Sequence, residues 1–170
     1  MAIVKATYTK SSTVAKASIR YIAHRPGKEG EKVTRNLFGI DGLLGRHAAY
    51  QMIDEAEKGS FFFRFVISPD PKGEDTQRDL SLREITERTM NALEARLHQE
   101  VSWVAVEHDD HAPHRHIHVI AVLQERLQVQ DFRALRQTAT EAALEQRKHR
   151  DLIQEHRRTK GEEAQWELQR

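Results

Sequence analysis

Hydrophobic and polar positions alternate at the start of the chain, over residues 2–8, and this period of two predicts a half-buried or edge strand. Serine and threonine then open residues 11–25, where apolar residues recur at helical spacing until a Pro-Gly pair follows. Small hydroxyl residues favour the start of a helix and Pro-Gly favours a turn. The pattern therefore predicts a helix over this segment.

Further along, apolar runs and amphipathic stretches alternate. The continuous apolar run at residues 61–67 predicts a central strand that is covered on both faces. The other expected elements are a strand or extended arm at 32–38, a helix at 44–57, a helix at 80–99, a strand at 101–106 and a strand at 116–123. Helices that alternate with strands in this way predict an α+β sandwich.

From residue 132 onward the chain is rich in Ala, Glu, Gln, Arg and Lys and contains no proline, which predicts a long polar helix. We expect one domain over residues 1–130 and a charged helical extension over residues 131–170. The extension either packs on the domain or continues it. Its apolar face becomes sparse toward the end, so a solvated helix, a dimer contact and a cover over a ligand all remain open.

Composition limits the classes of protein that the chain can represent. A length of 170 residues suits one domain with a core of its own. The chain has no cysteine, which excludes disulfides and thiolate metal sites. No apolar stretch reaches the roughly 20 residues that span a bilayer, and the N-terminus does not resemble a signal peptide. We expect a cytoplasmic protein without membrane insertion.

Charge is unevenly distributed although the net charge is only +1. Residues 1–50 carry nine lysines and arginines and only three acidic residues. Such a basic segment is typical of a surface that follows a nucleic-acid backbone, although solvated lysines produce the same pattern.

Residues 108–118 hold five of the ten histidines and continue directly into an apolar run. Successive side chains of a strand point to opposite faces, so His116 and His118 share one face while Ile117 points into the core. His108 ends the preceding strand and joins them if the two strands form a hairpin. Three imidazoles leave coordination positions open, which predicts a catalytic metal site; a solvated turn is the simpler alternative.

The register of the histidine pair has an alternative. His114 has the same parity as His116, so the ligands could be His108, His114 and His116. We favour the later pair because Ile117 supplies an apolar middle residue. Asp110 could hydrogen-bond a ligand imidazole, and His111 could reach the site from the loop.

The His-hydrophobic-His pair at residues 116–118, with His108 and Asp110 upstream, resembles the signature of HUH endonucleases and, among them, of plasmid mobilisation relaxases. The resemblance implies a central antiparallel sheet of about five strands flanked by helices. It also implies a DNA relaxase, which nicks and rejoins one DNA strand through a tyrosine nucleophile and a 5′-phosphotyrosine intermediate.

Three tyrosines are candidates for that nucleophile. Tyr21 is favoured because Arg20 and Arg25 flank it, and cations hold a phosphodiester and favour the phenolate. A packing role for Tyr21 on a buried helix face is the alternative. Tyr8 ends the first strand and Tyr50 lies in an amphipathic helix, where packing is the better interpretation.

The resemblance further implies single-stranded DNA at an origin of transfer as substrate, with accessory relaxosome and coupling proteins as partners. Lys16, Arg20 and Arg25 are the expected DNA contacts. The cofactor is a divalent ion, with Mn, Mg, Ni, Co and Zn all open, although Mg suits three nitrogens poorly. Two other functions remain possible: an HUH replication initiator or transposase, and a DNA- or metal-binding module without catalysis.

Overall fold

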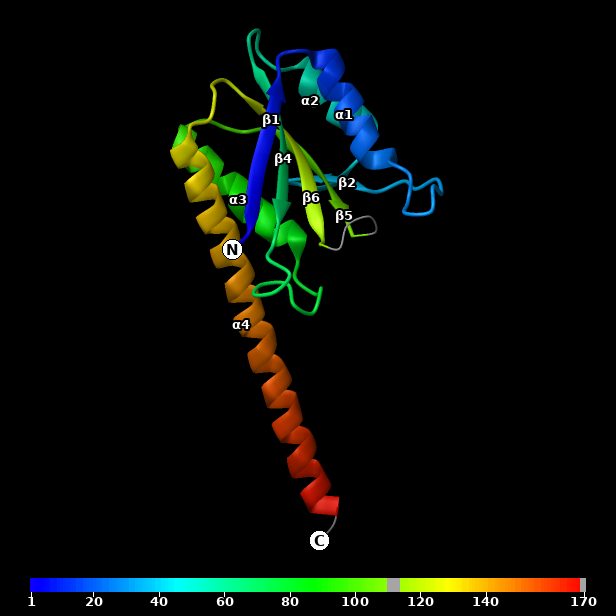
Figure 1. The fold of residues 1–170 in the computed structure, drawn as a ribbon, viewed down its shortest axis with the longest axis vertical. Helices are drawn as coiled ribbons and strands as arrows, with labels where there is room; N and C mark the ends of the chain where they lie inside the picture. Colours follow the sequence, from blue (N-terminus) through cyan, green and yellow to red (C-terminus); the bar gives the residue numbers. More distant parts are fainter. Residues whose placement is uncertain (110–113, 169–170) are drawn as a thin grey trace.

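The computed structural model describes residues 1–109 and 114–168, with side chains described up to residue 160. Its centre is one antiparallel sheet whose strands, across the described chain, follow the order β1-β4-β6-β5-β2-β3 (Figure 1). The strands are β1 (Ile3–Thr9), β2 (Leu37–Gly39), β3 (Gly42–Leu44), β4 (Phe61–Ser68), β5 (Trp103–His108) and β6 (His116–Leu123).

Helices cover both faces of the sheet. The first pair, α1 (Ser12–His24) and α2 (Arg46–Asp54), packs on one face over strands β4, β5 and β6. The second pair, α3 (Leu82–Leu97) and α4 (Val129–Leu168), packs on the other. Serine side chains cap two of these helices: Ser11 accepts a hydrogen bond from the Val14 amide at 3.3 Å, and Ser81 accepts one from the Glu84 amide at 3.2 Å.

The α+β class and the long last helix that the sequence predicts are confirmed. The sheet of about five strands is corrected to six in the described residues. The additional strand belongs to a hairpin in which Gly39 pairs with Gly42, whose φ of 111° suits glycine. Three-residue strands are too short to show a period of two, so the sequence does not predict β3, and the helix expected at 44–57 spans Arg46–Asp54 instead.

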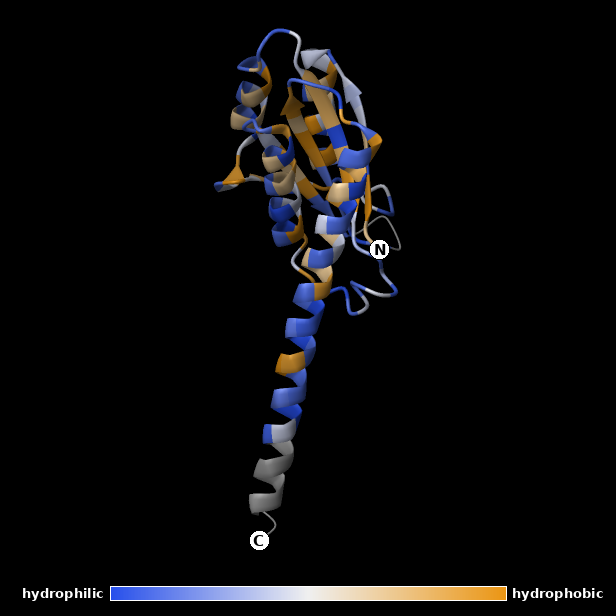
Figure 2. Cartoon of the chain, turned by 90° about the vertical axis from the view of Figure 1, so that its left-hand side faces the viewer, coloured by the Kyte–Doolittle hydropathy of each residue, from blue (hydrophilic) through white to orange (hydrophobic). Residues whose placement is uncertain are grey.

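The long helix α4 has two parts with different surroundings. Its first turns contribute Leu135, Ala139, Ala142 and Ala143 to the core beside α3. Beyond them the helix projects from the domain, and residues 151–160 are exposed and mostly polar (Figure 2). Among the described helices, none is both long and apolar enough to cross a bilayer.

Candidate metal centre and nucleic-acid face

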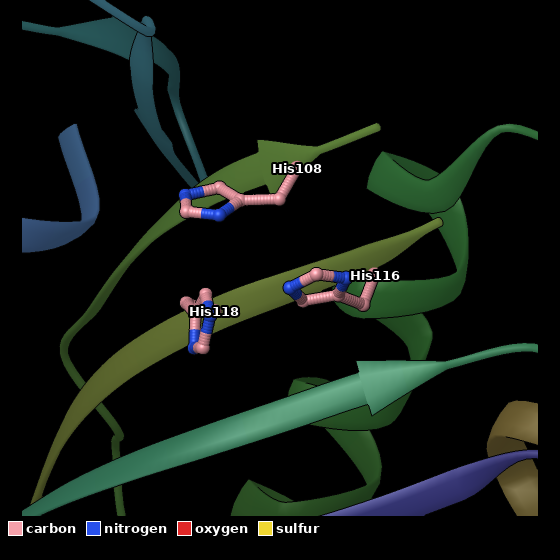
Figure 3. A group of neighbouring side chains, drawn as sticks. All are labelled: His108, His116 and His118. Carbon is pink, nitrogen blue, oxygen red and sulfur yellow. The ribbon is translucent and has the colours of Figure 1, made fainter. Parts of the chain in front are cut away.

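Three histidines come together where β5 ends and β6 begins. His108, the last residue of β5, is paired in the ladder with His116, the first residue of β6. His118 lies two residues further along β6, on the same face of the sheet. One ring nitrogen from each residue lies within 4.8 Å of the other two, and the rings point toward one another (Figure 3). This cluster could hold a metal ion.

Backbone carbonyls orient two of the rings. His108 Nε2 lies 2.8 Å from the carbonyl oxygen of Ile22 in α1, and His116 Nδ1 lies 3.2 Å from the carbonyl oxygen of His114. A carbonyl only accepts, so each of these nitrogens donates, and the second nitrogen of a neutral ring keeps its lone pair. Metal-binding histidines generally need such an outer contact to fix the tautomer.

Burial acts on the third ring. Burial is the main cause that lowers the pKa of His118 from 6.5 to about 3, and the neighbouring rings of His108 and His116 and the cations Arg64 and Arg25 add to it. His118 Nδ1 is buried and has no hydrogen-bond partner in the described part of the chain. A buried nitrogen without a partner is costly unless a ligand satisfies it.

The donor set therefore fits a divalent cation that accepts nitrogen ligands. Two imidazole nitrogens on one zinc-like ion lie at most about 4.2 Å apart, because each sits about 2.0–2.1 Å from the metal. The upper limit of 4.8 Å between the three ring nitrogens is close to this value. Three imidazoles leave at least one position for a ligand oxygen.

Arg115 lies between the histidines of the alternative register, and its side chain is held away from the cluster. Its guanidinium donates to Asp75 at 3.1 Å, to the Leu80 carbonyl at 3.1 Å and to Glu107 at 2.8 Å. The Arg115 carbonyl also accepts a hydrogen bond from the Ser68 hydroxyl at 2.9 Å. These contacts tie the residue that precedes β6 to β4, to β5 and to the segment before α3.

The histidines face a part of the sheet that α1 leaves open. Residues opposite each other in an antiparallel ladder point to the same face. His118 is opposite Val66 and Val66 is opposite Lys5, so Lys5 belongs to the histidine face. By the same register, Arg64 and Thr7 lie on this face one row further along. The side chains of Lys5, Thr7 and Arg64 are all exposed.

A groove of about 170 Å³ continues this face between β1 and α1. Thr7 and Arg64 line it from the sheet, and Val14 and Ser18 line it from the helix. An exposed cation beside a groove on the histidine face offers a contact for a phosphate close to the cluster.

Tyr21 lies on the same side of α1 as two residues that line this groove. Val14, Ser18, Tyr21 and Arg25 follow one another at spacings of four, three and four residues, which places them on one side of a helix. The first two line the groove, and the charge of Arg25 acts on His118. The Tyr21 side chain is 51% exposed, so the alternative of a buried packing residue is wrong.

The other expected site residues are dispersed around this centre. Arg20 is exposed and lines a hollow of about 630 Å³ with Tyr21 and Arg25. Lys16 forms an ion pair with Asp54 of α2 at 2.5 Å, which joins the two helices. His114 is exposed. Asp110 and His111 lie outside the described residues.

Sequence reasoning missed three residues: Lys5, Arg64 and Arg115. Arg64 is the single charged residue in the apolar run of β4, and that exception was a signal that one face of the strand is open. Lys5 is likewise a charged residue within β1, and it signals that one face of this strand is open. Arg115 has the opposite parity to His116, which was sufficient to direct it away from the histidines.

Comparison with known proteins gave no match to a family model, to a curated protein or to a solved structure.

Proposed function

We propose that this chain is a metal-dependent DNA strand transferase of the HUH relaxase type, which nicks and rejoins single-stranded DNA. The observation that carries the proposal is the convergence of three imidazoles on an open, basic sheet face beside the helix that bears Tyr21. The His108–Ile22 hydrogen bond ties that helix directly to the cluster.

His108, His116 and His118 would hold a divalent cation through nitrogen donors, which favours Mn, Co, Ni or Zn over Mg. When bound, this ion supplies positive charge to a non-bridging oxygen of the scissile phosphate. Arg25 and Arg64 add cationic charge to the same face, and Lys5 extends it toward the edge of the sheet. A single strand would follow this face through contacts to its phosphates.

The Tyr21 hydroxyl oxygen attacks phosphorus and forms the new ester bond, while the bond from phosphorus to the 3′ oxygen breaks. In the net balance the phenolic proton passes to the leaving oxygen, which becomes a free 3′ hydroxyl. The products are a 5′-phosphotyrosine and a 3′ hydroxyl. One phosphodiester has replaced another, so the reverse reaction rejoins the strand without ATP. In a mobilisation relaxase the substrate is an origin of transfer, with accessory and coupling proteins as partners.

The test is formation of a covalent adduct. The full chain is incubated with Mn and a pool of single-stranded oligonucleotides, and a denaturing gel shows whether protein and DNA migrate together. We expect an adduct from the wild type and from Tyr50→Phe, a matched control on α2, and none from Tyr21→Phe. Phenylalanine removes only the attacking oxygen, so the fold is preserved.

The possible results separate the alternatives. An adduct that persists in Tyr21→Phe overturns the choice of Tyr21 as nucleophile. If the wild type binds both metal and DNA but forms no adduct with any oligonucleotide, the chain is a binding module without catalysis. A replication initiator or transposase would share the adduct and differ in the DNA sequence that it cleaves.

A further inference from the structure

A cluster of aromatic rings and cations lies at the end of β1, separate from the histidines. Tyr8 contacts Phe61 and Phe63 of β4, with ring centroids 5.4 Å and 5.3 Å away. Two cations lie over these rings. The Arg126 guanidinium is 5.3 Å from the centroid of Tyr8, and Lys10 Nζ is 4.5 Å from that of Phe61.

The cluster is accessible to solvent and carries two cations. The Tyr8 side chain is 44% exposed, and Lys10 and Arg126 are exposed too. Within the described part of the chain, neither cation forms an ion pair with a carboxylate. An aromatic ring at the surface next to unneutralised cations is the combination that binds single-stranded nucleic acid, because a base stacks on the ring while its phosphates meet the cations.

The cluster also adjoins the groove that leads from the histidines. Tyr8 lines this groove together with Thr7 and Arg64. Lys5 lies in the row of His118, and Tyr8 is three residues further along β1, which corresponds to about 10 Å at 3.3 Å per residue. The ring of Tyr8 points to the opposite face from Lys5. Because β1 is an edge strand of the sheet, a DNA strand leaving the groove reaches this ring by passing over the edge.

We propose that Tyr8, Phe61, Lys10 and Arg126 form a second contact site for single-stranded DNA, a base-stacking platform about 10 Å along β1 from Lys5. It rests on the proposed function, because the groove links it to the histidine face. The platform takes an unpaired base: duplex bases are already stacked on one another, and an acidic peptide would use the cations without needing the ring. Tyr8 is thereby assigned a stacking role through its ring rather than a chemical role through its hydroxyl.

The experiment measures binding without cleavage. Fluorescence anisotropy follows the full chain with a labelled 20-nucleotide oligo-dT in EDTA, so that metal and chemistry are absent. We expect Tyr8→Leu, which keeps apolar volume but removes the ring, to weaken binding at least about fivefold, the low end of the effect of losing one stacked base. Tyr8→Phe should bind within about twofold of the wild type.

Salt dependence distinguishes stacking from charge. Arg126→Gln should lower the slope of log K against log salt by about 0.7, the value for one phosphate contact on a single strand. Tyr8→Leu should leave the slope unchanged. Tyr50→Leu is the matched control and should leave affinity unchanged, and thermal unfolding of every variant shows that the measured protein is folded.

The results bear on the platform and on catalysis separately. Unchanged affinity in folded Tyr8→Leu overturns the platform, and so does an equal loss in Tyr8→Phe and Tyr8→Leu, which would assign the effect to the hydroxyl. Loss of affinity only in Arg126→Gln also overturns it and points to an acidic ligand. A weakened Tyr8→Leu supports the platform even if the wild type forms no covalent adduct, because binding is measured without metal.

Discussion

Replacement of Arg115 by methionine tests whether the buried ion-pair network holds the histidine strand in place. Methionine has a similar reach but carries neither charge nor donors. The Arg115 side chain is only 12% exposed, and that of its partner Asp75 is 5% exposed. Burial lowers the pKa of Arg115, but the hydrogen bond to Glu107 and the charge of Asp75 more than offset this effect, so the net pKa is raised.

The expected loss of stability follows from what remains after the substitution. The Asp75 carboxylate would stay buried with its hydrogen bond to the Leu80 amide at 3.1 Å but without its cation. Breaking a buried pair in this way costs about 3–5 kcal/mol. For a chain of this size, each kcal/mol shifts the unfolding temperature by about 2–4 °C, so Arg115→Met should unfold about 6–20 °C earlier.

The metal site should weaken as well. Arg115 stands between His114, whose carbonyl orients His116, and His116 itself. Loss of the ion pairs that fix the backbone at Arg115 should disturb this carbonyl contact, and loss of such an outer contact typically lowers metal affinity about 10–100-fold. Calorimetric titration with Mn or Zn at a temperature where the variant is still folded measures this loss separately from unfolding.

Two further variants make the test specific. Arg83→Met removes an exposed arginine of α3 that pairs with Glu87 at 2.8 Å, and it should cost no more than about 0.5 kcal/mol. Adding Asp75→Asn to Arg115→Met removes the stranded charge and should recover at least about 1 kcal/mol of the loss. The reasoning is refuted if Arg115→Met unfolds like Arg83→Met, or if the double variant is no more stable than Arg115→Met alone.

Three other predictions concern pH, charge and the last helix. The pKa of His118 is lowered to about 3, so between pH 6.5 and 3 the unfolded protein takes up a proton at this ring and the folded protein does not. The stability of the apo-protein should therefore fall as the pH drops through this window, by less than about 1.4 kcal/mol per pH unit for this partly exposed ring. In urea unfolding, His118→Gln should show a smaller fall in stability between pH 7 and 5 than the wild type. Arg64→Gln should reduce the salt slope of oligo-dT binding by about 0.7 without changing the unfolding temperature, whereas an unchanged slope would remove Arg64 from the DNA path. Truncation after Gln154 should leave the unfolding temperature within about 2 °C, because residues 155–160 are exposed, and a larger drop would show that the projecting helix supports the domain.

The local sequence pattern alone determined several strands and the faces to which their side chains point. Alternation identified β1, and the uninterrupted apolar run identified β4, because burial of one or both faces imposes these periods. The same rule put His116 and His118 on one face and Ile117 on the other before any fold was known. Such features depend only on neighbours in the chain.

Tertiary structure decided what depends on pairing between distant residues. The row of Lys5, Val66 and His118 joins three strands, and its register is fixed by the simultaneous burial of two cores, which no single strand encodes. The Ile22 carbonyl that orients His108 comes from 86 residues away, and it reaches the ring only because α1 packs beside the end of β5.

The exposure of Tyr21 also depended on tertiary packing and not on local pattern. The helical spacing of Tyr21 fits a position on the buried side of α1 or at the margin of that side, because these two positions differ by only a few tens of degrees around the helix. Only the packing of α1 on the sheet buried Ile19 and Ile22 and left the Tyr21 side chain 51% exposed. The sequence identified the candidate residues, and the sheet determined which of them face one another, because side-chain direction is a local property whereas proximity depends on long-range packing.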